Sequence, residues 1–278
     1  MQGIGCVKVR NAASGMVEVH ELSRVGHYRA FDLQTASAIN AIEADSFTYG
    51  FTYGFSPLDT LFGAIKTRNT GTGTVEVHLM SRSSGYRDFV HQSGTAIPLS
   101  EADDFDFGFS TVTPGDLYCV KRRNTRLGRV EVQVFSRASR YQKSVLHVDT
   151  PIYEIDAPNF DFSARWSGLG IEGLLGIKHS NTPGTVELYA TGRAYDSLIL
   201  HTPSAFPIRP PSQFSYLFYP QLDQALLSVS LGAQPGGQMV VSQVSSPFTG
   251  TATLFSTPLG ATDTANFVFK IIPEALHV

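Results

Sequence analysis

The amino-acid sequence predicts an all-β chain that folds as a five-bladed β-propeller with four antiparallel strands in each blade. Three observations favour this fold class. A short element recurs five times at intervals of about 55 residues, apolar and polar residues alternate within the copies, and Gly, Asn and Pro interrupt them at regular places. Four short strands repeated at such a spacing are typical of propeller blades.

The composition agrees with a chain rich in strands and turns. Hydrophobic residues make up 42% of the 278 residues and charged residues only 16%, while Gly (25) and Pro (15) are frequent. This length is sufficient for one large domain with a substantial core. The formal net charge of −3 gives no electrostatic reason to expect a nucleic acid as partner.

The clearest repeated element is Val-Glu-Val-His or a close variant of it. Its five copies start 58, 55, 56 and 53 positions apart, and this regularity indicates tandem duplication. The copies start at Val17, Val75, Val130, Val186 and Met239. We therefore divide the single domain into repeats of approximately 1–60, 61–116, 117–173, 174–224 and 225–278.

Three further columns recur in step with this element. A Lys precedes it in four copies, at Lys8, Lys66, Lys121 and Lys178. An Asn follows each Lys, at Asn11, Asn69, Asn124 and Asn181. An aromatic pair ends each unit, at Phe47/Tyr49, Phe105/Phe107, Phe160/Phe162, Phe214/Tyr216 and Phe267/Phe269. The fifth copy lacks the charged columns but keeps the apolar ones, so we expect it to fold like the others.

Each unit is predicted to contain four strands, which in the second copy span residues 62–68, 74–81, 86–92 and 104–109. Two arrangements of these strands stay open. Each unit could form one blade by itself, or the last strand of the chain could complete the first blade and thereby remove an exposed sheet edge.

A column of small residues lies two positions before the Lys column, at Cys6, Ala64, Cys119, Gly176 and Ser228. We expect the first strand of each blade to line the crowded central axis, where only small side chains fit. The two cysteines occupy equivalent positions in non-adjacent blades, so we expect them to pack as free thiols without forming a disulfide.

The charged columns are interpreted as structural. Antiparallel pairing of the first hairpin would place Arg10 opposite Glu18 and Lys8 opposite His20, and ion pairs repeated in every blade are more often structural than catalytic. Acidic residues also recur before the aromatic pairs, at Glu43, Asp45, Glu101, Asp103, Asp156 and Asp263. Glycoside hydrolysis needs one asymmetric carboxylate pair, so this repetition favours a capping device or a repeated ligand contact.

No cofactor, metal site or catalytic activity is predicted. The eight histidines lack the close spacing of a zinc ligand set, and the glycine-rich segments lack the Lys-Ser/Thr of a phosphate-binding loop. The sequence also lacks an Asp-x-Asp-Gly loop of the kind that binds calcium.

Ten residues form the candidate carbohydrate-binding site. Turns between second and third strands combine a cation with an aromatic ring, and loops before the first strands add acidic groups and the single Trp. The residues are Arg24, Tyr28, Arg82, Tyr86, Arg137, Tyr141, Asp59, Asp116, Glu172 and Trp166. Aromatic faces beside planar polar groups suit the CH and OH surface of a pyranose. An equally weighted alternative is that the tyrosines pack within the blades.

The repeated Asn-Thr, Val-Glu-Val-His, Ser-Arg-x-Ser-x-Tyr and Phe-x-Phe elements resemble those of small β-propeller lectins, with the five-bladed tachylectin-2 type closest in blade number and the fungal propeller lectins similar in style. The resemblance implies multivalent, metal-free carbohydrate binding, with N-acetylated amino sugars as ligands and glycans or glycoproteins as partners. Two alternatives from other classes are a five-bladed glycoside hydrolase and a propeller that binds proteins.

The sequence contains no apolar run long enough to span a membrane, and its first residues lack the apolar stretch of a secretory signal. We expect a soluble protein that is cytoplasmic or is secreted without an evident signal peptide. Self-association into a homo-oligomer stays open.

Overall fold

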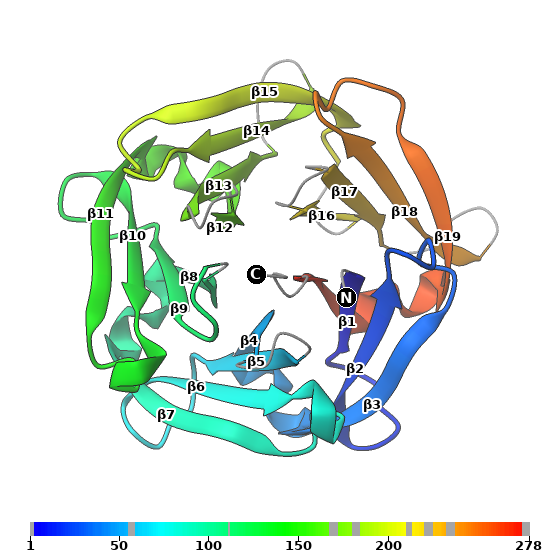
Figure 1. Cartoon of the computed structure of the whole chain (residues 1–278), viewed down its shortest axis with the longest axis horizontal. Coiled ribbons are helices and arrows are strands. Elements are labelled where there is room, and N and C mark those ends of the chain that lie inside the picture. Colours follow the sequence, from blue (N-terminus) through cyan, green and yellow to red (C-terminus); the bar gives the residue numbers. More distant parts are fainter. Residues whose placement is uncertain are drawn as a thin grey trace.

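The computed structural model describes residues 3–54, 59–110, 112–166, 172–179, 184–209, 213–219, 225–231 and 237–273. Its strands form five four-stranded antiparallel sheets in a ring around a central axis (Figure 1). This architecture is a five-bladed β-propeller, which confirms the predicted fold class. No helix within these described ranges is long and apolar enough to cross a membrane.

Each blade has an innermost strand, two middle strands and an outermost strand. Blade 1 consists of β20 (Phe267–Ile272), β1 (Gly3–Lys8), β2 (Met16–Ser23) and β3 (Phe31–Asn40). Blade 2 consists of β4 (Phe47–Tyr53), β5 (Thr60–Lys66), β6 (Thr74–Ser81) and β7 (Phe89–Pro98). Blade 3 consists of β8 (Phe105–Phe109), β9 (Leu117–Lys121), β10 (Arg129–Phe135) and β11 (Ser144–Tyr153). Blade 4 consists of β12 (Phe160–Trp166), β13 (Glu172–Lys178), β14 (Thr185–Thr191) and β15 (Leu198–Pro207). Blade 5 consists of β16 (Phe214–Tyr219), β17 (Ala225–Ser230), β18 (Gln238–Ser245) and β19 (Thr253–Gly260).

Short 3-10 helices connect several of these strands. Four of them lead from the outermost strand of one blade to the innermost strand of the next: η1 (Ala41–Ser46), η3 (Leu99–Asp104), η5 (Glu154–Asn159) and η6 (Ala261–Asn266). Two shorter ones, η2 (Arg82–Ser84) and η4 (Arg137–Ser139), lie between the second and third strands of blades 2 and 3. The acidic residues before the aromatic pairs fall in the first group.

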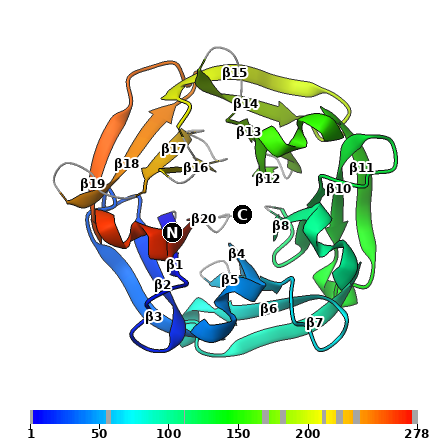
Figure 2. The same cartoon turned by 180° about the vertical axis from the view of Figure 1, so that it is seen from behind.

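The blades are offset from the sequence repeats by one strand. Each sheet combines the last strand of one repeat with the first three strands of the next, so β20 pairs with β1 and places Phe269 opposite Cys6. Figure 2 shows β20 beside β1 from the other side of the ring. The chain therefore closes by completing its first blade with its last strand, which settles the alternative that the sequence left open.

The innermost strands carry the aromatic pairs and surround the axis, where β20 contacts β4 and β16, and β8 contacts β4 and β12. The small-residue column lies one strand further out, which corrects the expectation that it lines the axis. Each small residue is opposite the second aromatic residue of the innermost strand, as Ala64 is opposite Tyr49 and Cys119 is opposite Phe107. Opposed residues point to the same face of a sheet, so the small side chain leaves room for the neighbouring ring.

The pairing within the first hairpin also differs from the prediction. Lys8 is opposite Glu18, and the residue opposite His20 is Cys6. Arg10 lies in the turn because β1 ends at Lys8 and Asn11, with a φ of 52°, reverses the chain there. The predicted register was therefore wrong by two residues, and the same correction holds for the second and third copies. Asn69 and Asn124 have the same left-handed conformation as Asn11, which Asn tolerates better than most other residues do.

Most of the hydrophobic core lies between blades. Buried side chains form five clusters, each of which combines residues from two neighbouring sheets. At Gly63 a Cβ atom would lie 2.1 Å from the ring of Phe109 in the next blade, so this position has no room for a side chain. In the following interface the sizes are exchanged, because Tyr118 stands in the place of the glycine and Ala164 in that of the phenylalanine.

Candidate functional site

The predicted tyrosines are structural elements of the blade interfaces. Tyr28, Tyr86 and Tyr141 are buried, and each has a positive φ between 58° and 60° in the turn before the outermost strand. Tyr86 therefore ends a turn and does not start a strand, which moves the start of the third strand from the predicted residue 86 to Phe89. The structure also places Tyr195 and Phe248 in this column, with a similar positive φ. Their spacing of 54 and 53 residues from the preceding members could have revealed them in the sequence.

Arg82 and Tyr86 bind across a blade interface. Arg82 Nε lies 2.9 Å from Glu21 Oε2, and the Tyr86 hydroxyl donates a hydrogen bond of 2.6 Å to Glu21 Oε1. Glu21 belongs to blade 1 and is buried, so its carboxylate is satisfied by blade 2. The backbone carbonyl of Tyr86 also accepts a 3.0 Å hydrogen bond from the N–H of Ala38 in blade 1. These contacts join two blades and leave the Tyr86 ring covered.

The predicted acidic residues hold the turns of their own blades. Asp59 accepts hydrogen bonds of 3.0 and 2.8 Å from the Ser81 hydroxyl, and Asp116 accepts one of 2.8 Å from the Arg137 backbone N–H. Burial raises the pKa of the Asp116 carboxyl. The structure thus brings Asp116 and Arg137 together, and the Tyr141 hydroxyl donates to Gly115 beside them.

Three predicted residues remain: Arg24, Trp166 and Glu172. Arg24 is half-buried in the turn before Tyr28. Trp166 and Glu172 are opposite each other where β12 and β13 meet their connection, but their side chains lie outside the described part of the chain. A sugar-binding role for the ten candidate residues stays a prediction, whereas the packing role of the three tyrosines is observed.

A second group of residues recurs in four blades, and the sequence had assigned it a structural role only. In each of these blades a Lys of the first middle strand is opposite a Glu of the second middle strand, and a His contacts that Glu; we call this group the Lys–Glu–His cluster. Its members are Lys8, Glu18 and His20 in blade 1, Lys66, Glu76 and His78 in blade 2, Lys121, Glu131 and His147 in blade 3, and Lys178, Glu187 and His201 in blade 4.

Each cluster Lys lies over an aromatic ring. The distances from Nζ to the ring centroid are 5.6 Å for Lys8 and Phe267, 5.4 Å for Lys66 and Phe47, 5.4 Å for Lys121 and Phe105, and 5.5 Å for Lys178 and Phe160. An acidic residue of the preceding 3-10 helix pairs with three of these cations, as Glu43 does with Lys66 at 2.9 Å. The cation is thus held between a ring and a partly exposed carboxylate.

The Glu–His pair is kept in all four blades, although the strand that supplies the His changes. The imidazole–carboxylate distances are 3.4 Å (His20–Glu18), 3.5 Å (His78–Glu76), 2.9 Å (His147–Glu131) and 3.5 Å (His201–Glu187). In blades 1 and 2 the His is on the second of the two middle strands, and in blades 3 and 4 it is on the outermost strand. Gln92 occupies the outermost position in blade 2, where its amide contacts His78 at 2.9 Å.

In blades 1 and 2 the surroundings of the cluster favour a neutral imidazole beside an ionised carboxyl. Burial lowers the pKa of His78, and the neighbouring Glu76 only partly compensates for it. Burial alone would raise the pKa of Glu76, but hydrogen bonds from the Thr72 hydroxyl and backbone N–H outweigh burial and lower it. The clusters of blades 1 and 2 therefore present a carboxylate, a cation and a neutral hydrogen-bonding ring together.

Blade 5 lacks this group. Ser230, Val240 and Ser242 stand at the positions of the Lys, Glu and His, and the blade still forms a four-stranded sheet with the same pairing. The cluster is therefore not required for a blade to fold.

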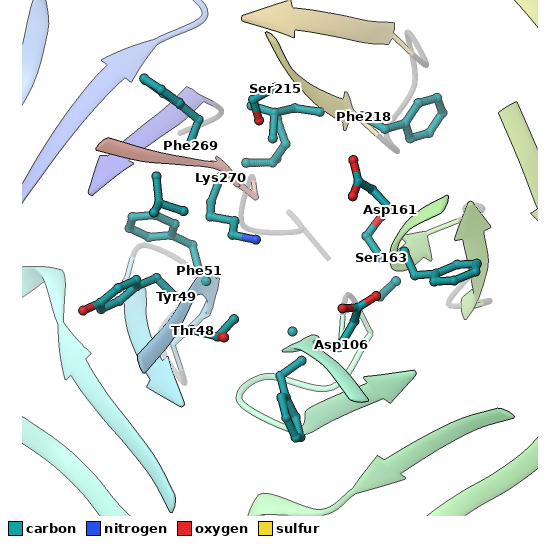
Figure 3. Close-up of a pocket in the computed structure, with 18 of the residues that line it drawn as sticks. Thr48, Tyr49, Phe51, Asp106, Asp161, Ser163, Ser215, Phe218, Phe269 and Lys270 are labelled. Carbon is teal, nitrogen blue, oxygen red and sulfur yellow. The ribbon is translucent and has the colours of Figure 1, made fainter. Parts of the chain in front are cut away.

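A cavity of a different kind lies at the propeller axis. The innermost strands line a channel with a cavity of about 560 Å³. Asp106, Asp161 and Lys270 line this channel, together with the hydroxyl side chains of Thr48 and Ser163 (Figure 3). Asp106 and Asp161 stand at the same position of blades 3 and 4, between the two residues of the aromatic pair, whereas the other three blades have uncharged residues there. Lys270 has no charged equivalent in the other blades, so the charge around the axis is asymmetric although the blades repeat.

Both cysteines are free thiols in different blades, and burial raises the pKa of each. Among the described residues, no three His, Cys, Asp or Glu side chains converge in a way that could hold a metal ion.

The comparisons with known proteins add no family. No model of a known protein family matches the chain, and a search of curated proteins finds no significant relative.

Proposed function

We propose that the chain is a multivalent, non-catalytic carbohydrate-binding protein with a shallow site at the Lys–Glu–His cluster of each of blades 1 to 4. The observation that carries the proposal is the retention of the same chemistry in four blades, by different strands, and its loss from a fifth that folds without it. Folding of a blade does not require this group, and the group persists although its His comes from different strands. Both properties are those of a repeated ligand contact.

The exposed atoms of the cluster suit a sugar. Gln34 and Gln92 are exposed on the outermost strands of blades 1 and 2, and His147 and His201 are exposed on those of blades 3 and 4. A partly exposed ring lies nearby in blade 2, where Phe89 packs edge-on against His78 at 5.6 Å. Amide, imidazole and carboxylate groups around an apolar ring can bind the hydroxyls and the CH face of a pyranose.

N-acetylated amino sugars are the ligand class that we propose, following the resemblance to propeller lectins. Single shallow sites bind weakly, and four sites on one rigid ring would gain strength by avidity on a surface that carries many glycans. Glycans or glycoproteins would be the partners.

The test is calorimetric titration with N-acetylglucosamine and N-acetylgalactosamine, combined with binding to a glycan array. We expect a stoichiometry of about four sugars per chain, which follows from the four clusters. Lys66→Met keeps the packing on Phe47 but removes the cation, and it should remove one site. Changing all four cluster lysines to Met should weaken binding to a glycan surface by roughly 100-fold or more.

Lys143→Met is the matched control, because Lys143 is exposed in a turn outside the clusters. A folded wild-type protein that binds no glycan at millimolar concentration would refute the proposal. Capture of protein ligands without glycans would favour the protein-binding alternative.

A glycoside hydrolase is the second candidate, and one observation favours it. The axial channel contains two carboxyls in unlike surroundings, Asp106 and Asp161, in one cavity. Release of reducing sugar from oligosaccharides, lost in Asp106→Asn, would support this candidate over binding without turnover.

A further inference from the structure

The charges in the axial channel lie on opposite walls. Lys270 is on β20 of blade 1, whereas Asp106 is on β8 of blade 3 and Asp161 is on β12 of blade 4. In a ring of five blades, the boundary between blades 3 and 4 lies across the axis from blade 1. In Figure 3 the Lys270 ammonium points into the channel, and the two carboxylates lie on its far side.

The Lys270 ammonium has no hydrogen-bond or ion-pair partner among the residues that the structure describes. Burial lowers the pKa of Lys270, and Asp106 and Asp161 act across the channel in the opposite direction. Lys270 is half-buried in the channel, and a cation at such a place without a contacting partner is stabilised when a ligand supplies an anion. The position therefore calls for a negatively charged group in the channel.

The wall that carries Asp106 and Asp161 favours a positively charged group. Asp106 is paired with Arg122, whose Nε lies 3.1 Å from Asp106 Oδ2. Asp161 is contacted by His179 at 3.7 Å from Oδ2, and its side chain is 64% exposed to the channel. One carboxylate is thus largely neutralised, and Asp161 keeps an accessible oxygen that could accept hydrogen bonds from a cationic group.

We infer that the axial channel binds a dipolar small molecule of the short-peptide class, with its carboxylate at Lys270 and its ammonium at Asp161. A neutral sugar would leave the Lys270 ammonium without a counter-charge, and a simple anion would make no charge pair with Asp161. The cavity of about 560 Å³ is in the range of small-molecule sites and is wider than a single charged contact needs. Its apolar walls, which include Phe51 and Phe218, can take the uncharged middle of such a ligand.

This inference goes beyond the proposed glycan binding, because it concerns one site at the axis and none of the repeated clusters. The two can fail independently.

The experiment uses dialanine, trialanine and tetraalanine as probes, with N-acetylated and C-amidated forms of each, in calorimetric titrations of the full chain. We expect at least one of the free peptides to bind with a stoichiometry of one. Blocking either end should weaken its binding by about tenfold or more, because one charge pair is lost.

Two variants assign the ends. Lys270→Met should bind the free peptide and its amide equally, because the carboxylate has lost its partner. Asp161→Asn should bind the free peptide and its N-acetyl form equally. Lys143→Met, outside the channel, should bind as the wild type does, and circular dichroism reports whether each variant is folded.

The inference is wrong if none of the free peptides binds the folded wild-type chain at millimolar concentration. It is equally wrong if binding is unchanged in Lys270→Met or insensitive to blocking the ends. Binding of a neutral oligosaccharide in the channel, lost in Asp161→Asn and without peptide binding, would also overturn it.

Discussion

Asp106 carries a carboxyl whose ionised form is destabilised by burial in the folded chain. Burial raises its pKa to about 6, although Arg122 and Lys270 act to lower it. In an unfolded chain an aspartyl carboxyl has a pKa of about 3.9. The folded chain therefore binds a proton at this site between about pH 4 and pH 6, where the unfolded chain has lost it, and folding stability falls as the pH rises through that range.

Asp106→Asn should accordingly raise the free energy of unfolding at pH 8 by roughly 1–3 kcal/mol. The amide oxygen of the variant can still accept a hydrogen bond from Arg122. The gain should shrink as the pH falls from 6 to 4, where the wild-type carboxyl becomes protonated in the fold. Urea denaturation at several pH values measures the difference between variant and wild type. Asp103→Asn removes an exposed carboxylate from the same blade and should show no such pH-dependent gain; a gain at pH 4 equal to that at pH 8 would contradict the assignment.

Neighbouring blades match a large side chain on one sheet with a small one on the other. The Phe109 ring occupies the space over Gly63, and in the following interface the ring belongs to Tyr118 and the small residue is Ala164. The side-chain volume of the pair is thus supplied mainly by one sheet in the first interface and by the other sheet in the second. Close packing explains why one side must be small wherever the other is large.

Gly63→Ala should lower the free energy of unfolding by about 1–3 kcal/mol, because the added methyl group overlaps the Phe109 ring. Phe109→Ala alone opens a cavity and should cost about 3–5 kcal/mol. In the double variant the loss of unfolding free energy should be smaller than the sum of the two single losses, because the methyl group then enters the vacated space. Urea denaturation of the four proteins measures this coupling.

Gly71→Ala is the matched control for this cycle, because no atom lies within 4 Å of the position that the added methyl group would occupy. It should change the stability by less than about 0.5 kcal/mol. Strict additivity of Gly63→Ala and Phe109→Ala would show that the ring contact is not the cause.

The ring as a whole is closed by one strand. β20 pairs with β1 over six residue pairs, and it also contacts the innermost strands of the blades on either side. Blade 1 therefore depends on residues from both ends of the described chain. Without β20, the edge of β1 and the inner side of two interfaces would be exposed.

Truncation after Asn266 should lower the melting temperature by roughly 10 °C or more and increase aggregation, because a strand and two interfaces are lost. Circular dichroism and light scattering measure these changes. A synthetic peptide that covers residues 267–273 should restore part of the loss when added in excess. An unchanged melting temperature for the truncated chain would mean that closure contributes little to stability.

Much of this architecture could be predicted from the sequence because it depends on local and repeated signals. The Val-Glu-Val-His copies indicated the number of blades, and the alternation of apolar and polar residues indicated the strands. The Glu21–Arg82 pair could not be predicted, because only blade 1 has a Glu at that position and its partner is 61 residues away. The Lys–Glu–His cluster was visible as columns, but the exchange of strands between His78 and His147 conceals their equivalence in any alignment by position.

The sequence by itself therefore determined the fold class, the repeat and the strand content, since these follow from periodicity and turn chemistry along the chain. Only the tertiary structure decided which strand lines the axis, how the ring closes and which charges face one another across the channel. Asp106 and Asp161 share one column of two consecutive repeats, whereas Lys270 belongs to a different column of the last repeat. Their meeting at the axis results from the closure of five blades into a ring, a long-range condition that no local pattern records.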